Sequence, residues 1–398
     1  MPTAILDLEA TDLPATVRVP HGYRQARILL RIDGRPAAWV ETPVENGEVQ
    51  RQAVMDALRE ADNWPFWQLL AESQLGLADL TPPLEHALPS ATVAICTRDR
   101  PEDLRRCLEG LLRLPDEGQE ILVMDSASQS PDTRTVAAAF PTVRYLRLER
   151  RGLNVARNAA MAAARGDIVV FIDDDAVPDA NWLAEHRRAF RNPLTMASMG
   201  LTLPLELETE AQELFELYSG FSRGFYPHTF QNSTLHPLAA GHTGAGVNMA
   251  LRREIVELVG PFDDALDAGT PTHSGGESEL LSRILEHHYR IAYTPSALNW
   301  HRHRRTMDEL RRTIFGYGVG VYAFWTARVL DEREWGALLL GAGWLRYDQL
   351  PRLLRSLARR PGTLPWPLPW DELRGCLVGP AAYLRSRREA QRAAQEAQ

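Results

Sequence analysis

Lysine is absent from this sequence of 398 residues, so each of its 44 basic side chains is an arginine. A protein without lysine cannot form a Schiff base, hold pyridoxal phosphate or complete a Walker-type phosphate loop. Any positive contact to a phosphate must therefore come from arginine, backbone N–H groups, a helix N-terminus or a metal ion. We attribute the absence itself to codon bias in a GC-rich genome.

Cysteine and long apolar runs are also scarce. Cys96, Cys107 and Cys376 are too few and too scattered for a disulfide framework or a zinc site, which favours a reducing compartment such as the cytoplasm. The longest apolar run, at 335–345, is about half of what a bilayer span needs. The acidic first residues lack the apolar segment of a signal peptide, so we expect a soluble or peripheral protein.

The net charge of −8 is unevenly distributed along the chain. Residues 1–300 carry 27 arginines and 42 acidic residues, whereas residues 301–398 carry 17 arginines and 10 acidic residues. The acidic body argues against nucleic-acid binding. The basic, tryptophan-rich tail is compatible with peripheral contact to an anionic membrane, although core packing is the default interpretation of its aromatic residues.

Four regions are predicted along the chain. Residues 1–80 form a small accessory unit with a hairpin about the Asp33–Gly34 turn and a helical stretch near 51–75. A proline-rich linker follows at 81–90. Residues 91–305 alternate between strands and helices, and residues 306–398 are helical and basic.

The alternation after residue 91 predicts an α/β fold with a mainly parallel sheet covered on both faces. Apolar strands are expected at 91–96, 120–124, 143–148 and 168–172. Ligands bind beyond the carboxyl ends of such strands. Thr97, Asp125 and the Asp173–Asp175 run each follow a strand, so the fold should gather them at one edge.

Three consecutive aspartates after an apolar strand repel one another unless a cation is bound. Hard divalent ions prefer such carboxylate oxygens. Alternate residues of an extended segment point the same way, so Asp173 and Asp175 can reach one ion. The competing interpretation is a solvated acidic turn, which the position after a buried strand makes less favourable.

Six segments between 91 and 305 also follow one another in a distinctive order: CTRDRPEDLRRCLEGLL, EILVMDSAS, GLNVARNAAMAAARGDIVVFIDDD, GAGVNMALRR, GGESELLSRIL and YRIAYTPSALNWHRHRR. As an ordered set they resemble family 2 of the inverting glycosyltransferases. That resemblance implies a GT-A fold, which is a Rossmann-like, mostly parallel sheet flanked by helices. It also implies a nucleotide-diphosphate-sugar donor and a divalent metal, Mn²⁺ or Mg²⁺, at a DxD motif.

The resemblance assigns roles to individual positions. Asp125 matches the residue that reads the base, usually uracil, although an aspartate at a strand end is also a common turn cap. Arg157 matches a position near the ribose and phosphates. Further donor-contacting positions lie in the first nucleotide loop, at the ribose and in the sugar-pocket loop: Thr97, Arg98, Asp99, Asp174 and Asn248.

The metal ligands implied by the resemblance are Asp173, Asp175 and, after the last strand, His301. His303 fits that position less well. Taken alone, His301 reads as a surface residue at the start of a basic helix.

Glu277 aligns with the family's catalytic base, and Glu279 with a second acid. Here the sequence departs from the family, because glutamate replaces the commoner aspartate and Gly276 precedes it. Both glutamates can alternatively be first-turn helix acids stabilised by the helix dipole.

These features predict an inverting, metal-dependent glycosyltransferase that moves a sugar, from a UDP-sugar by preference, to a hydroxyl acceptor. The acceptor can be a glycan, a lipid-linked molecule or a small molecule. A non-catalytic nucleotide-sugar-binding or scaffold subunit of the same fold is the alternative that the Glu277 departure favours. A nucleotidyltransferase is disfavoured, because the segment after the first strand has no glycine.

Overall fold

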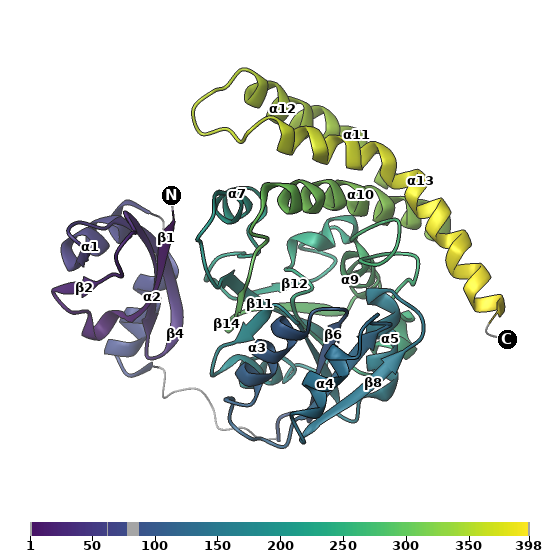
Figure 1. Ribbon diagram of the computed structural model, residues 1–398, viewed down its shortest axis with the longest axis horizontal. Helices are drawn as coiled ribbons and strands as arrows, with labels where there is room; N and C mark the ends of the chain where they lie inside the picture. The colour runs from purple at the N-terminus through teal and green to yellow at the C-terminus, as the bar shows by residue number, and fades with distance from the viewer. Residues whose placement is uncertain (1, 62, 78–86, 397–398) are drawn as a thin grey trace.

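The computed structural model describes residues 2–61, 63–77 and 87–396. They form an N-terminal unit, a large central sheet covered by helices, and a C-terminal group of helices (Figure 1). The linker expected at 81–90 lies mostly outside the described residues, so its boundaries remain a prediction.

The N-terminal unit is a three-stranded sheet with two helices and a small second ribbon. The sheet has the order β1 (Thr3–Glu9), β3 (Gln25–Ile32), β4 (Arg35–Pro43), and the ribbon pairs β2 (Thr16–Arg18) with β5 (Glu48–Gln50). The helical stretch divides into α1 (Arg51–Glu60) and α2 (Trp64–Gln74). Asp33 and Gly34 join β3 to β4 with φ of 51° and 73°, the left-handed conformations that a tight hairpin turn requires.

This unit packs directly against the central sheet. Leu29 belongs to one buried cluster with Leu201 and Leu298 of the central sheet, and Trp39 lies 6.5 Å from Trp300, ring centre to ring centre. An ion pair of 2.5 Å joins Arg31 to Asp179 across the same contact. The accessory unit is therefore held by both apolar burial and charge.

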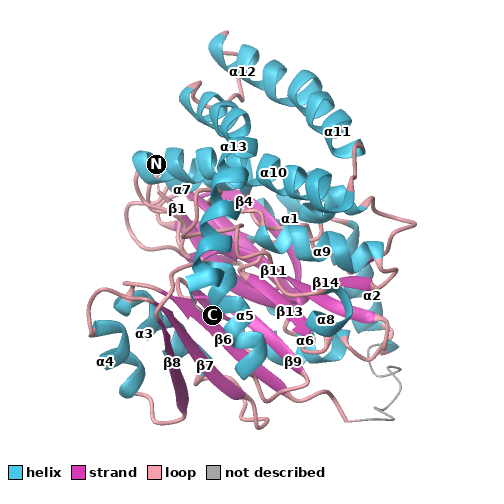
Figure 2. Ribbon diagram, turned by 90° about the vertical axis from the view of Figure 1, so that its right-hand side faces the viewer, coloured by secondary structure: helices cyan, strands magenta, loops and turns pink. Residues whose placement is uncertain are grey.

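The central sheet has nine strands, and most of them run in one direction (Figure 2). Six strands are parallel to one another, in the order β14, β11, β9, β6, β7 and β8 along the sheet. Strand β13 lies between β11 and β9 and runs in the opposite direction. The short strands β10 and β12 pair with β14 and are antiparallel to it. The bounds are β6 (Ala91–Thr97), β7 (Glu120–Ser126), β8 (Val143–Leu148), β9 (Ile168–Asp173), β10 (Ala176–Pro178), β11 (Thr195–Pro204), β12 (His228–Phe230), β13 (Asn248–Arg252) and β14 (Arg290–His301).

Helices cover both faces of this sheet. Val93 and Ile95 of β6 pack with α3 (Pro101–Leu111), α4 (Asp132–Ala138) and α6 (Trp182–Ala189), while Ala94 between them packs with α5 (Leu153–Ala163), α8 (Ile255–Val259) and α9 (Gly276–Glu286). Successive side chains of a strand point to opposite faces, so a fully apolar strand such as β6 needs cover on both sides.

Two strands differ from the sequence expectation. β11 was not predicted, because TMASMGLTLP mixes polar and apolar residues, although all ten residues are buried. β14 continues as far as His301, where the basic surroundings alone indicate the start of a helix. His301 therefore closes a buried strand and does not begin a surface helix.

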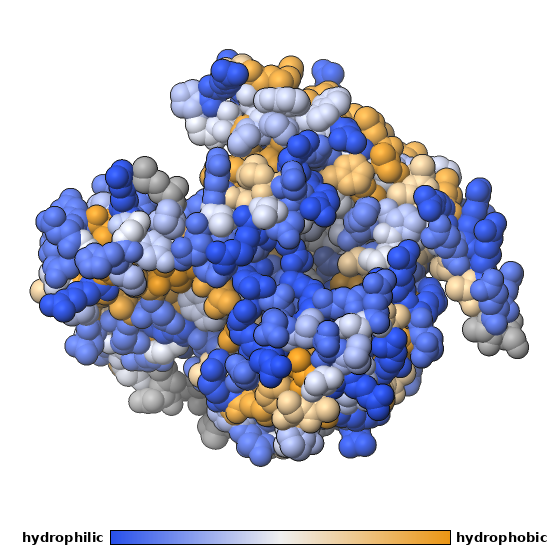
Figure 3. Space-filling model, in the orientation of Figure 1, coloured by the Kyte–Doolittle hydropathy of each residue, from blue (hydrophilic) through white to orange (hydrophobic). Residues whose placement is uncertain are grey.

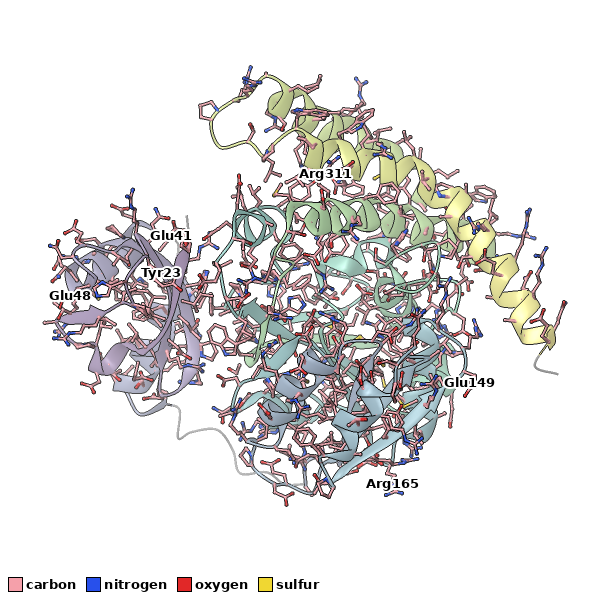
Figure 4. All side chains as sticks on the ribbon, in the orientation of Figure 1. Tyr23, Glu41, Glu48, Glu149, Arg165 and Arg311 are labelled. Carbon is pink, nitrogen blue, oxygen red and sulfur yellow. The ribbon has the colours of Figure 1, made fainter. Side chains whose placement is uncertain are left out.

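The C-terminal helices stack on α10 (Met307–Glu332). They are α11 (Gly336–Trp344), the π-helical segment Leu345–Gln349, α12 (Leu350–Leu357) and α13 (Pro367–Glu396), and α7 (Glu210–Ser219) lies nearby. Glycine permits the close crossing of α10 and α13, since a Cβ on Gly318 or Gly375 would lie 2.2 Å from a carbonyl oxygen of the other helix. Arg311 of α10 lies beneath α13 (Figure 4), 2.6 Å from Asp371. Within the described ranges, no helix is long and apolar enough to cross a membrane.

Candidate active site

The candidate site lies at the carboxyl edge of the central sheet. Register pairs Cys96 at the end of β6 with Asp173, and Thr97 with Asp125 of β7. β14 runs in the same direction and brings His301 to the same edge. The parallel arrangement therefore gathers residues that lie as much as 200 positions apart in the sequence, as the strand alternation predicts.

Asp173, Asp175 and His301 form a group able to hold a metal ion. Each offers one ligand atom, and these atoms all lie within 4.8 Å of one another. Asp175 Oδ1 is buried without a hydrogen-bond partner among the described residues, although His301 Nε2 lies 3.0 Å away. Two carboxylates and an imidazole suit Mn²⁺, which accepts both oxygen and nitrogen ligands. Mg²⁺ can bind the carboxylate oxygens of the same group.

Arg100 bridges the carboxylates of Asp174 and Asp175 in this turn. It donates at 2.7 Å to Asp174 Oδ1 and at 2.7 Å to Asp175 Oδ2, and Arg304 donates to the same Asp175 oxygen at 3.2 Å. Thr97 Oγ1 donates to Asp174 Oδ2 at 2.7 Å. Asp174 is thereby turned toward the loop after β6, away from the Asp173–Asp175–His301 group.

The three aspartates carry unequal proton affinities. Burial raises the pKa of Asp173, and burial raises the pKa of Asp174 to about 8 in spite of Arg100. Burial acts against ionisation of Asp175 as well, but His301, Arg100 and Arg304 hold the pKa of that carboxyl well below its ordinary value. A divalent cation favours the ionised form of every ligand, so its binding at neutral pH would displace protons from this turn.

A second charged cluster surrounds Glu277 at the N-terminus of α9. Arg157 of α5 is 3 % exposed and donates at 2.7 Å to Asp267, while the same Nη1 atom lies 3.9 Å from Glu277 Oε2. Burial and the neighbouring Asp267 raise the pKa of Glu277 to about 7, and Arg157 opposes the rise. A carboxyl group with this pKa can accept a proton at neutral pH.

Glycines bring the backbone close to this cluster. A Cβ on Gly246 would lie 2.7 Å from Arg157 Nη2, and one on Gly276 would lie 2.2 Å from Asn154 Nδ2 and 2.7 Å from Asp267 Oδ2. Gly275 adopts a φ of 101° before the helix begins. The glycine that precedes Glu277, where the sequence departs from the family, is thus required by the space beside Asp267.

Comparison with known proteins shows which family and which fold the chain resembles. The model of "Glycosyl transferase family 2" matches residues 92–259, which contain β6 to β13 and the Asp173–Asp175 turn. The match covers about 42 % of the chain, 168 of its 398 residues. The resemblance drawn from the ordered segments is confirmed, and the chain is a glycosyltransferase enzyme.

Individual relatives extend the likeness beyond the matched residues. Glycosyltransferase AglE of Haloferax volcanii is 26 % identical over 276 residues, which is 67 % of this chain and 83 % of the relative. Pre-mycofactocin glycosyltransferase of Mycobacterium tuberculosis is 27 % identical over 246 residues, or 60 % of this chain and only 48 % of that protein.

A solved structure supports the fold. Mannosyltransferase PcManGT from Pyrobaculum calidifontis, in complex with GDP-Man and Mn²⁺, superposes with a TM-score of 0.50 at 18 % identity. The match covers 78 % of this chain and 94 % of that one. The predicted α/β, GT-A architecture is therefore confirmed.

The loop after β6 is linked to the loop after β7 through Ser128. Asp125 is fully buried and accepts from the Ser128 N–H at 2.8 Å, and Ser128 Oγ accepts from the Asp99 N–H at 3.0 Å. Asp99 has a φ of 53° and lies 3.4 Å from Arg98, whose buried Nε has no hydrogen-bond partner among the described residues. Asp125 thus acts at least as the turn cap that the sequence left open.

Asn248 does not fit the role that the resemblance implied. Its side chain is fully buried, and the oxygen accepts from Trp182 Nε1 at 2.8 Å and lies 2.8 Å from His186 Nε2. Its amide nitrogen donates to the carbonyl groups of Leu201 and Ala297. With every polar group engaged in the core, Asn248 supports β13 and does not face a sugar.

Sequence reasoning missed three residues that complete the two clusters: Arg100, Asp267 and Arg304. Arg100 stands in the quoted segment CTRDR, so its position after the strand was a usable signal. Asp267, with a φ of 82°, lies in the irregular segment before α9, and nothing in the local sequence marks it.

Proposed function

We propose that the domain transfers a sugar from a nucleotide-diphosphate-sugar, UDP-linked by preference, to a hydroxyl acceptor with inversion at the anomeric carbon. The observation that carries this proposal is the occurrence, at one sheet edge, of a candidate metal group and a separate carboxyl group with a pKa near 7. The first suits the diphosphate of the donor and the second suits the hydroxyl of the acceptor.

Asp173, Asp175 and His301 would hold the divalent ion, Mn²⁺ or Mg²⁺. The ion supplies charge that neutralises the diphosphate as it leaves. The structural neighbour was solved with GDP-Man and Mn²⁺, which supports a metal ion beside the donor in this fold. Arg100 and Arg304 keep Asp175 ionised and therefore ready to bind.

The loops after β6 and β7 are proposed to hold the nucleoside. Thr97, Arg98 and Asp99 stand on one loop, and Asp125 stands on the other, joined to it through Ser128. Arg98 Nε is buried 3.4 Å from Asp99 Oδ2 and makes no hydrogen bond among the described residues, and we propose that it donates to the nucleotide once this ion pair opens. Asp174 is engaged by Thr97 and Arg100, so a ribose contact through Asp174 requires one of these bonds to exchange.

Glu277 is proposed as the base. Its carboxylate takes the proton of the acceptor hydroxyl while that oxygen bonds to the anomeric carbon on the face opposite the diphosphate. The bond between this carbon and the diphosphate oxygen breaks, and its electron pair leaves with the diphosphate. Arg157 and Asp267 set how readily Glu277 accepts the proton, because one lowers its pKa and the other raises it.

A thermal-shift screen of UDP, GDP and dTDP, each with and without Mn²⁺, tests the donor half of this proposal. We expect UDP with Mn²⁺ to give the largest stabilisation, since a ligand that binds only the folded state stabilises it by mass action. If no nucleotide stabilises the protein, the donor assignment is wrong. Sugar transfer retained at the full rate by Glu277→Gln would favour a different base or a different function.

A further inference from the structure

Exposed apolar side chains are concentrated in the C-terminal helices. Of the 22 large hydrophobic residues that are exposed among the described residues, 14 lie between 330 and 384. Leu339 is 79 % exposed and Tyr347 is 76 % exposed. Figure 3 shows these orange side chains gathered over the upper helices of the molecule, interspersed with blue. A soluble surface seldom carries so many apolar groups together without a partner.

Many of them form one stripe. α11, the π-helical segment and α12 follow one another as a single helical run from 336 to 357 (Figure 2). Five of its seven exposed large apolar residues recur at three-, four- or eight-residue intervals, which places them on one side of the run: Leu339, Tyr347, Leu350, Leu354 and Leu357. Gly341, Leu353 and Ser356, between them, are buried against the molecule. Leu338 and Leu340 flank Leu339. Exposed Trp335 and Trp366 flank the run.

The same segment is strongly basic. Residues 335–370 contain five arginines and one acidic residue, Asp348, which pairs with Arg352. Arg355, Arg359 and Arg360 are exposed, and no acidic partner is found for them among the described residues. Residues 1–300, in contrast, carry an excess of acidic side chains. We call the exposed apolar stripe with these three arginines the apolar–basic face.

We propose that the apolar–basic face rests on the surface of an anionic lipid bilayer. Leucine and aromatic side chains would enter the boundary between headgroups and acyl chains, and arginines would contact the lipid phosphates. A second copy of this chain is a poorer occupant, because a symmetric interface would place the unpaired arginines of two copies together. This proposal is independent of the sugar-transfer chemistry.

Co-flotation of the full chain with vesicles tests the proposal. We compare pure phosphatidylcholine vesicles with vesicles that contain about one third phosphatidylglycerol. Leu339→Gln/Leu354→Gln is expected to weaken binding about tenfold or more, since each leucine loses the transfer of its side chain out of water. Arg355→Gln/Arg359→Gln/Arg360→Gln is expected to weaken binding about 100-fold on anionic vesicles alone, and added salt should reproduce the loss.

Matched controls replace exposed leucines elsewhere, Leu75→Gln/Leu217→Gln, and should bind as the wild type does. All substituted side chains are exposed, so the variants should fold, and circular dichroism checks this. Wild-type protein that does not co-float with anionic vesicles overturns the proposal. So does a dimer seen in sedimentation without lipid that Leu339→Gln/Leu354→Gln dissociates, because that result assigns the face to a second copy.

A different observation concerns His301 and rests on the proposed metal site. His301 Nδ1 lies 2.9 Å from His303 Nδ1, and His303 Nε2 lies 2.6 Å from Glu216 Oε1. A carboxylate only accepts hydrogen bonds, so Nε2 of His303 carries its proton and Nδ1 of a neutral His303 is an acceptor. His301 must then donate from Nδ1. With a second proton on Nε2, His301 is a cation that pairs with Asp175 Oδ1 at 3.0 Å; without that proton, the lone pair of Nε2 faces the same oxygen.

A divalent ion that binds Asp175 can therefore replace the Nε2 proton and bind the same lone pair, provided that Nδ1 keeps its proton. We infer that His303 and Glu216 are positioning residues that fix His301 in the tautomer whose Nε2 binds the metal. The rings are also held by packing, since Phe215 lies 4.4 Å from His303 and Phe221 lies 5.2 Å from His301, ring centre to ring centre. Such outer partners of a ligating histidine commonly affect metal affinity by about 10- to 100-fold.

Direct titration of the protein with Mn²⁺, followed by electron paramagnetic resonance, tests this role without any sugar transfer. We expect Glu216→Gln and His303→Phe to weaken Mn²⁺ binding by about 10- to 100-fold. Glu213→Gln on the same helix, which contacts Arg27 instead, is the control. The melting temperature without metal separates a loss of fold from a loss of affinity.

The outcomes distinguish the two assignments. Wild-type protein that binds no Mn²⁺ overturns the metal site and this role with it. Wild-type binding that both variants reproduce overturns the positioning role alone and leaves the metal site standing.

Discussion

Two buried carboxyl groups at the sheet edge, those of Asp175 and Glu277, have pKa values shifted in opposite directions. Asp175 lies beside His301, Arg100 and Arg304, which together hold its pKa well below the ordinary value despite burial. Glu277 has one nearby cation, Arg157, which it shares with Asp267, and its pKa rises to about 7. The cations beside Asp175 outweigh the effect of its burial, whereas Arg157 does not outweigh the burial of Glu277 and the negative charge of Asp267.

Replacement of Asp175 by asparagine should have the largest effect. Asp175→Asn removes the ionised ligand and leaves Arg100 and Arg304 with one fewer anion, so we expect Mn²⁺-dependent stabilisation by UDP to disappear. Sugar transfer should fall by about 1,000-fold or more, because the leaving diphosphate is no longer neutralised. Thermal shift and a transfer assay measure the two losses.

Asp179→Asn is the matched control for that change, since Asp179 pairs with Arg31 of the N-terminal unit and lies outside both clusters. A metal-dependent shift that survives in Asp175→Asn would contradict the assignment of this carboxylate as a ligand.

Glu277→Gln should have the second largest effect and should separate the clusters cleanly. Removal of the base is expected to lower kcat by about 100- to 10,000-fold. Donor binding should persist, because the Asp173–Asp175–His301 group is untouched, and the UDP–Mn²⁺ thermal shift measures this. Glu257→Gln, an exposed glutamate of α8, serves as the control. Equal loss of donor binding and of turnover would show that the clusters do not act separately.

The pH dependence gives a finer comparison. The base works ionised, so kcat/KM of the wild type should rise with pH through about 7, the pKa of Glu277. Asp267→Asn removes the neighbouring anion and frees Arg157 for Glu277, which should move this rise to lower pH by roughly one unit. Asparagine tolerates the φ of 82° at this position, so the backbone should be retained.

The contribution of Glu277 to the free energy of unfolding should fall as the pH rises, whereas kcat/KM should increase. The folded pKa of Glu277 lies above its ordinary value of 4.5, so folding takes up a proton and this group favours the folded state at low pH. That contribution is lost as the pH rises through about 7. An acidic limb of kcat/KM that stays in place in Asp267→Asn would assign the titration to a different group.

The candidate metal group could be predicted from the sequence because two of its residues follow a strand that the local sequence pattern indicates. Asp173 and Asp175 follow an apolar strand, and strand alternation predicts that their edge also carries Thr97 and Asp125. His301 required the family resemblance, since its basic surroundings alone favour a helix start. Glu277 sits at a helix N-terminus, which the sequence also indicates, but its partner Asp267 comes from an irregular segment without periodicity or turn motif. Tertiary packing alone brings it to Arg157.

The same limit explains one residue whose role differs from expectation, Asn248, and one residue that sequence reasoning missed, Arg100. Asn248 follows glycines that resemble a pocket loop. Its side-chain amide is instead hydrogen-bonded to Trp182 and to two backbone carbonyl groups. The unpredicted strand β11 and the long strand β14 supply these carbonyl groups. Arg100 stood beside the predicted Thr97, Arg98 and Asp99, but the reach of its side chain to Asp174 and Asp175 depends on how α3 begins.

Glu279 offers the smallest expected effect on activity and tests where the Glu277 cluster ends. It aligns with a second acid, yet its carboxylate is engaged by Arg283 at 2.8 and 2.7 Å and approached by Arg328 at 3.5 Å. Glu279→Gln should therefore cost about 2–4 kcal/mol of stability, as a buried arginine loses its anion, while kcat stays within about twofold. Thermal unfolding and steady-state kinetics on one preparation separate these outcomes. A fall in kcat with an unchanged melting temperature would extend the proton-accepting cluster to two glutamates, and the contrast with Asp175 would then rest on a pair of carboxylates that share one proton.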